Sequence, residues 1–288
     1  MVKKLAAYTA VRDYAVHEVE SALVKYGDES LGEARFMPGG AAHAWDEWWA
    51  MYVGSLEDGG NEAGEKDGEG KGYGPYLLGE KRAPGFGTSG KIIGNGGASK
   101  VNWNLMFAAH AGQRLLQSPG NAEKLKGVAQ CVRAVSIVPS IQGCLEYAYK
   151  ASEPAVIEDA DVPKYQAEAY AFCASALPFL AEADPTAATK VHETVRVDSG
   201  QRPEWDIVKV SFSAKNLNAM GVRCADVGAL SVAYPDSGHT QCVDGELSNP
   251  KADASACDRI EMPSGAGSLR AGMGALVATL VATALMLV

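Results

Sequence analysis

The feature that most constrains the fold of this chain is a tryptophan-rich segment, HAWDEWWAMYVG, at residues 43–54. On a helix its large aromatic side chains are spaced three and four residues apart and form one stripe: Trp45, Trp48, Trp49 and Tyr52. Buried aromatic rings dominate the energetics of a protein core. The segment therefore predicts a helix whose aromatic face packs against other helices.

Helical spacing of apolar residues recurs along the chain. Residues 11–26 place their apolar side chains on one face, and Gly27 supplies a stop. Further helices are expected over residues 100–117, 121–150 with a bend near Pro139, 162–183, 186–197 and 203–220, although 207–212 has strand character. Gly-rich stretches at 54–75 and 85–97 are expected to be loops. The sequence predicts an all-α fold, an irregular multi-helix bundle with long Gly-rich loops, in one domain over residues 1–245.

The cysteine spacing argues for disulfides rather than a zinc site. The six cysteines contain no CxxC pair: Cys131, Cys144, Cys173, Cys224, Cys242 and Cys257. Two of them, Cys131 and Cys144, fall on one predicted helix about 20 Å apart, which is too far for a bond between them. Two others flank a loop rich in Gly, Pro and Asp. We therefore expect a disulfide between Cys224 and Cys242 that staples a C-terminal loop region.

The last residues resemble an attachment signal for a glycosylphosphatidylinositol (GPI) anchor. Residues 273–288 form an uncharged apolar tail, preceded by a linker at 246–272 that contains the small residues Ser264, Gly265 and Ala266. The interpretation is GPI attachment at Ser264. A tail-anchored membrane helix and a buried helix are the alternatives.

The first residues do not match that interpretation. A GPI-anchored protein needs a signal peptide, but Arg12 and Asp13 interrupt any apolar segment near the start. We therefore expect the chain to lack its true N-terminus. The alternative is a cytosolic protein with a tail anchor.

Charge and motifs exclude several function classes. The net charge is −9 and no cluster of Lys and Arg occurs, which argues against nucleic-acid binding. The segment GFGTSGKI at 85–92 lacks the Ser or Thr and the preceding strand of a nucleotide-binding loop. No hydrolase, zinc-protease or dinucleotide-binding signature is present.

Candidate metal ligands lie opposite the apolar faces of two predicted helices. One helix carries His43, Asp46 and Glu47, and the other carries Asp13, His17 and Glu20. Imidazole and carboxylate groups suit iron, manganese or zinc. If the two helices pack as neighbours, the six residues form a shared iron site. The alternative is that both faces are solvated.

A second set of candidates lies beside apolar stripes on other helices. His110 is flanked by apolar residues on both sides, and Glu146 and Glu168 adjoin aromatic stripes. A buried carboxylate needs a partner, a proton or a metal. These three residues are therefore the fallback metal ligands, and the alternative for His110 is a satisfied core histidine.

Four segments carry a resemblance to a known family: AWDEWWAMYVG at 44–54, YLLGEKRAPGFGT at 76–88, AEAYAFCASALPFLAEADPTAA at 167–188 and RCADVGAL at 223–230. They resemble the low-iron-inducible periplasmic, or iron-assimilating, proteins of algae, over about residues 10–240. The resemblance implies a secreted or surface-held protein that binds iron, assists its uptake without enzymatic activity, and meets a plasma-membrane iron transporter. The alternatives are a surface adhesion or cell-wall interaction protein and an uncharacterised enzyme.

Overall fold

The computed structural model describes residues 4–54, 74–90, 99–155, 159–247, 249 and 251–260. Across these residues the fold is all-α, with an isolated bridge between Ser89 and Ser99 as the sole β pairing, which confirms the predicted fold class. The α-helices are α2 Val11–Gly27, α3 Ala41–Val53, α4 Pro75–Phe86, α5 Lys100–Leu115, α6 Ala122–Ser136, α7 Val138–Ala151, α8 Val162–Ala183, α9 Pro185–Val195, α10 Trp205–Ser211, α11 Ala214–Ala219 and α12 Cys224–Val227. Short π and 3-10 turns complete the set: η1 Leu5–Ala10, η2 Glu29–Phe36, η3 Asp159–Asp161, η4 Leu230–Val232, η5 Pro235–Ser237 and η6 Ala254–Arg259.

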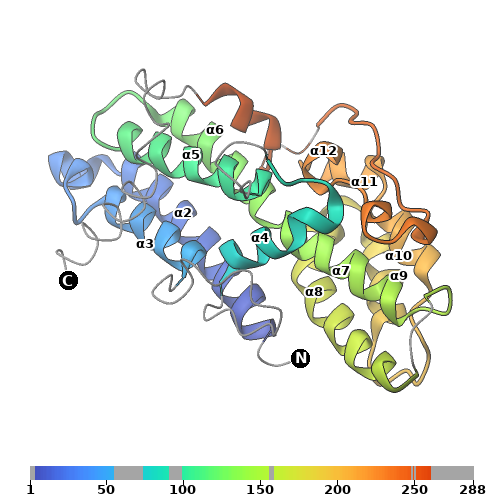
Figure 1. The fold of residues 1–288 in the computed structure, drawn as a ribbon. Coiled ribbons are helices and arrows are strands. Elements are labelled where there is room, and N and C mark those ends of the chain that lie inside the picture. Colours follow the sequence, from blue (N-terminus) through green and yellow to red (C-terminus); the bar gives the residue numbers. More distant parts are fainter. Residues whose placement is uncertain are drawn as a thin grey trace, which may run out of the picture.

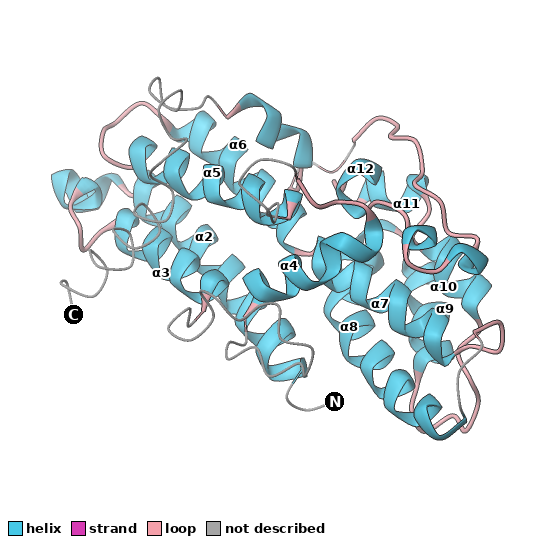
Figure 2. Ribbon diagram, viewed as in Figure 1, coloured by secondary structure: helices cyan, strands magenta, loops and turns pink. Residues whose placement is uncertain are grey.

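The helices pack largely as pairs of sequence neighbours. Figure 1 shows α2 and α3 with α5 and α6 at one end of the molecule, and α8 to α12 at the other. Helix α4 lies between the two ends, and α7 packs along α8. Loops join the helices mainly at the surface (Figure 2).

The aromatic stripe of α3 lies in the core, as predicted. Trp45, Trp48 and Tyr52 are buried, and Trp49 is half-buried at the edge of the core. The polar atoms of two rings are satisfied across the helix pair: the Trp45 indole N–H donates to the carbonyl of Ala109 at 2.9 Å, and the Tyr52 hydroxyl bonds Asn102 at 2.6 Å. These bonds fix the rotation of α3 against α5.

Helices α6 and α7 form the centre of the fold. The run Ala122–Ala151 is apolar and long enough to cross a membrane, but 89% of its most apolar window is buried inside the protein. The bend predicted near Pro139 is present as a break between two helices. Helix α6 ends at Ser136 and α7 begins at Val138. Pro139 stands in the first turn of α7, where its missing N–H costs no helical hydrogen bond.

The helix expected over 203–220 is confirmed as α10 and α11, despite the strand character of 207–212. Trp205, Val208 and Phe212 follow helical spacing and all three are buried. Helix α4 is not among the helices predicted from the sequence. Pro75 at its first turn favours the helix start, and Gly87 with φ of +69° ends it.

Three disulfides link the described cysteines. The expected bond between Cys224 and Cys242 is present. Cys131 and Cys144 do not pair with each other, as expected from their spacing. They bond instead to Cys257 and Cys173 respectively. Such bonds persist in an oxidising, extracytoplasmic compartment.

The predicted anchor lies outside the described residues. The structure describes only part of the linker at 246–272, and neither Ser264 nor the tail at 273–288 belongs to the described part. GPI attachment at Ser264 therefore stays a prediction.

The contact between α3 and α5 gives a testable expectation for stability. A Cβ on Gly112 would overlap the buried indole ring of Trp45. We expect Gly112→Ala to lower the free energy of unfolding by about 2 kcal/mol, because overpacking outweighs the gain in helix propensity. Urea denaturation measures the change. The matched control is Gly127→Ala in α6, where no atom lies within 4 Å of the new Cβ and stability should rise by about 0.5–1 kcal/mol. Equal effects of the two changes would contradict the packing argument.

Candidate functional site

The six primary metal candidates lie on the solvent side of α2 and α3. The two helices do pack as neighbours, as the shared site requires. However, the side chains of His43 and Glu47 are 58% and 40% exposed, and those of Asp13 and Glu20 are 51% and 58% exposed. Two further candidates, His17 and Asp46, are also exposed.

Several of these side chains already have local partners. Asp13 accepts a hydrogen bond from buried Arg12, and Glu20 pairs with Arg133 at 3.4 Å. His43 Nε2 lies 3.5 Å from Glu47 Oε1 on the same helix. Within the described part of the chain, no three His, Cys, Asp or Glu side chains group closely enough to hold a metal.

The shared six-ligand site is therefore not assembled. The reason is geometric. Each ligand face lies opposite an apolar stripe, so the packing that buries the stripes turns the polar faces toward water. A metal role for any single one of these residues stays a prediction.

Two of the fallback residues are engaged by cations instead of needing a metal. Glu146 accepts a hydrogen bond from the buried guanidinium of Arg82, and its other oxygen lies 2.8 Å from Lys150 Nζ. Glu168 pairs with Lys4 at 2.7 Å. Burial alone would raise the pKa of each carboxyl, but the cations outweigh burial and hold both pKa values below the ordinary range.

The same ion pairs enclose an aromatic residue, Tyr147 of α7. Its ring stacks on Phe172 of α8 with centroids 5.5 Å apart, and the guanidinium of Arg82 lies 4.9 Å from the centroid of the Tyr147 ring. Burial raises the pKa of Tyr147 to about 12, with nearby Arg82 opposing the rise and Glu168 adding to it. This charged cluster links α4, α7 and α8 and has a structural role that accounts for both carboxylates.

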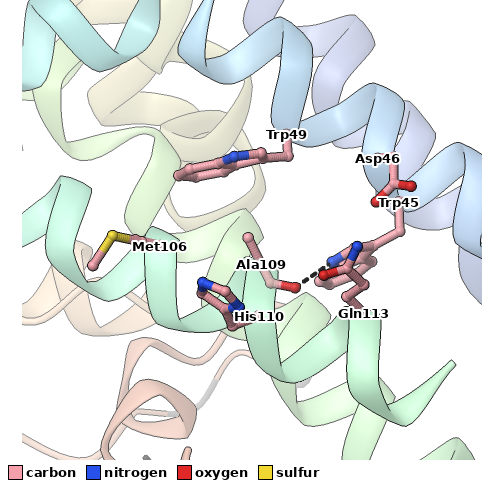
Figure 3. Close-up of a pocket in the computed structure, with 7 residues that line it drawn as sticks. All are labelled: Trp45, Asp46, Trp49, Met106, Ala109, His110 and Gln113. Atoms are coloured by element: carbon pink, nitrogen blue, oxygen red, sulfur yellow. Dashed lines mark hydrogen bonds between the residues drawn. The ribbon is translucent and has the colours of Figure 1, made fainter. Parts of the chain in front are cut away.

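His110 and Asp46 line one pocket between α5 and α3. Figure 3 shows Asp46 and the rings of Trp45 and Trp49 coming from α3, while Met106, His110 and Gln113 come from α5. The cavity volume of the pocket is about 20 Å³, roughly the space of one water molecule. That is far below the range of about 300–1,000 Å³ typical of small-molecule sites, so the pocket has room for little more than one ion or one water.

Burial changes the pKa of both titratable groups that line this pocket. Burial and nearby Arg114 lower the pKa of His110, so its imidazole is neutral at neutral pH and offers a nitrogen lone pair. Although Asp46 is largely exposed, its apolar surroundings raise the pKa of the carboxyl, and the positive field of His43 opposes the rise only in part. A bound cation would stabilise the carboxylate form that these surroundings disfavour.

Three side chains of the lining carry donor atoms: Asp46, His110 and Gln113. Imidazole nitrogen and carboxylate oxygen are ligand types that iron accepts, and the amide oxygen of Gln113 adds a third. Sequence reasoning named Asp46 and His110 but assigned them to separate sets, and it missed Gln113. The spacing of Gln113, three residues after His110 on one helix, was the available signal.

The chain matches no protein-family model, and comparisons with curated proteins and with solved structures give no match. The resemblance to algal iron-assimilating proteins stays a prediction based on the four segments.

Proposed function

We propose that this protein works outside the plasma membrane as a non-enzymatic iron-binding protein that assists iron uptake. The three disulfides support an oxidising compartment. Attachment at Ser264 through a GPI anchor would hold the protein at the cell surface. The four segments that resemble algal iron-assimilating proteins support the link to iron.

One observation carries the proposal: Asp46 and His110, from two different helices, line the same small pocket. With Gln113 they offer two oxygens and one nitrogen, and water would complete the coordination of iron. A site with so few charged ligands binds weakly. Weak binding suits a protein that collects iron and releases it to a membrane transporter.

Titration with Fe²⁺ under anaerobic conditions tests the proposal. Two tryptophans line the pocket, Trp45 and Trp49, so bound iron should quench their fluorescence. We expect Asp46→Asn and His110→Leu each to weaken iron binding at least tenfold, which corresponds to about 1.4 kcal/mol. Asp46 is exposed and His110 is half-buried beside the pocket mouth, so both variants should keep the helical circular-dichroism spectrum.

The matched control uses the outward face of α3. The double change His43→Ala with Glu47→Ala removes an exposed His–Glu pair and should leave iron binding unchanged. If the control lowers affinity while the pocket variants do not, the iron site lies on the outer face. If no variant changes the titration, or iron does not bind at all, the iron proposal fails and the adhesion function becomes the better one.

A further inference from the structure

A second pocket lies at the other end of the molecule from the α3–α5 pocket. It forms between α10, α11 and α12 and the loop that follows η5, and Figure 1 shows these elements far from α3. Its cavity volume is about 230 Å³. This volume is just below the range of about 300–1,000 Å³ that drug-sized ligands occupy, so the pocket suits a smaller organic ligand.

The polar end of the pocket contains a histidine with a fixed tautomer. His239 is only 8% exposed, and its Nδ1 accepts a hydrogen bond from the backbone N–H of Leu230 at 3.1 Å. Burial lowers the pKa of His239, and nearby Lys209 lowers it further, so the ring is neutral at neutral pH. Because Nδ1 accepts, the single ring proton must reside on Nε2. His239 is therefore a hydrogen-bond donor at Nε2.

A lysine supplies positive charge to the same lining. Lys209 lies on α10, where Nζ is 2.7 Å from Asp206 Oδ1 and 5.8 Å from the centroid of the Trp205 ring. Asp206 is 85% exposed, so water screens this surface pair and the ammonium keeps donor capacity for a ligand. Thr240 adds a hydroxyl at the mouth.

The other residues that line the pocket are mainly apolar, and the surrounding structure holds them in place. Phe212, Leu217 and Val227 are buried residues that contribute to the pocket. The rim includes Cys242, which the disulfide to Cys224 ties to α12. Gly228 has φ of +75°, and a Cβ there would overlap the carbonyl oxygen of Phe86, so the backbone of this wall sits directly against α4. The pocket is a formed feature of the folded chain.

We propose that this pocket binds a small organic anion, with a carboxylate head bonded to Lys209 and to the Nε2–H of His239 and a short apolar body against Phe212 and Leu217. The lining combines a cation and a neutral donor and contains no carboxylate, so it selects an acceptor with negative charge. The apolar walls select a ligand with a hydrocarbon part. This site is independent of the proposed iron pocket.

Calorimetric titration of the full chain tests the proposal with matched six-carbon probes. Hexanoate should bind, hexanamide should bind at least tenfold more weakly, and hexylamine should not bind. Lys209→Gln removes the charge but keeps a polar side chain that is one atom shorter, and it should weaken hexanoate at least tenfold while changing hexanamide less than twofold. His239→Asn preserves an acceptor for the Leu230 N–H but removes the Nε2–H donor, so it should weaken both hexanoate and hexanamide.

The control variant is Lys190→Gln, which removes an exposed charge on α9 away from the pocket lining. It should bind hexanoate like the unaltered chain. Circular dichroism should confirm that all variants fold, and Lys209 is a partly exposed position where a fold defect is not expected. The proposal is overturned if hexanoate does not bind, if hexylamine binds equally well, or if Lys209→Gln binds hexanoate with unchanged affinity.

Discussion

Replacing Cys131 and Cys257 together by alanine should lower the free energy of unfolding by about 5 kcal/mol. The bond between these cysteines spans a sequence separation of 126 residues, and the loop-entropy relation gives about 4.9 kcal/mol for a closed loop of that length. The stabilisation arises mainly from restricting the unfolded chain. Urea denaturation without reductant, with the other two disulfides intact, measures the loss.

A comparison among the disulfides separates loop entropy from local packing. The bond between Cys224 and Cys242 spans 18 residues, so its removal should cost only about 3 kcal/mol. The segment around Cys257 also has contacts of its own: the Ala254 N–H donates to the Gly221 carbonyl at 2.8 Å, and Ala254 and Ala256 are buried. The segment should therefore stay docked without its disulfide. A larger loss from the shorter loop would show that native-state strain or packing outweighs loop entropy.

These two bonds also show which structural features a single sequence reveals. The pair Cys224 and Cys242 was predictable because a short loop of turn-forming residues separates them. The pair Cys131 and Cys257 was not, because it depends on η6 packing against α6, a contact between distant segments. Helical spacing likewise predicted α2, α3, α5 and α8 closely, because each helix buries a stripe of apolar residues that is visible in its own sequence. It also predicted a helix over 203–220, which the structure divides into α10 and α11 although 207–212 has strand character.

The candidate site shows the same limit. Periodicity placed Asp46 and His110 on faces of their own helices, but it could not show that the two residues line one pocket. It also could not show that Arg82 and Lys150 neutralise Glu146, because Arg82 belongs to α4, a helix that the apolar spacing did not predict. The sequence shows which side chains are able to bind a metal. Which other side chains lie next to them depends on how the helices pack.

Arg82→Met should lower the free energy of unfolding by about 3 kcal/mol at pH 7. The guanidinium is 3% exposed, bonds Glu146 and donates to the Tyr147 hydroxyl at 3.2 Å. Removing one partner of a buried ion pair typically costs about 3–5 kcal/mol, because the other charge stays buried without compensation. We expect the lower value of this range because Lys150 still pairs with Glu146 at 2.8 Å. Urea denaturation of both proteins gives the difference.

The pH dependence of that difference identifies Glu146 as the group responsible. Arg82 and Lys150 hold the pKa of Glu146 in the folded protein below its unfolded value of about 4.3, against the effect of burial. The pair's contribution is therefore present above about pH 4.3 and is lost as the pH falls through the lower, folded pKa. In Arg82→Met the effect of burial is less opposed, so the pKa of Glu146 in the folded variant rises and the variant loses less stability in acid. The difference in unfolding free energy between the two proteins should therefore narrow between pH 7 and pH 4.

A double variant tests the same assignment. Adding Glu146→Gln to Arg82→Met should recover part of the loss at pH 7, because it removes the uncompensated charge. A gap that stays constant over this pH range, with no recovery in the double variant, would instead assign the loss to the packing of Arg82 against Tyr147 and Phe172.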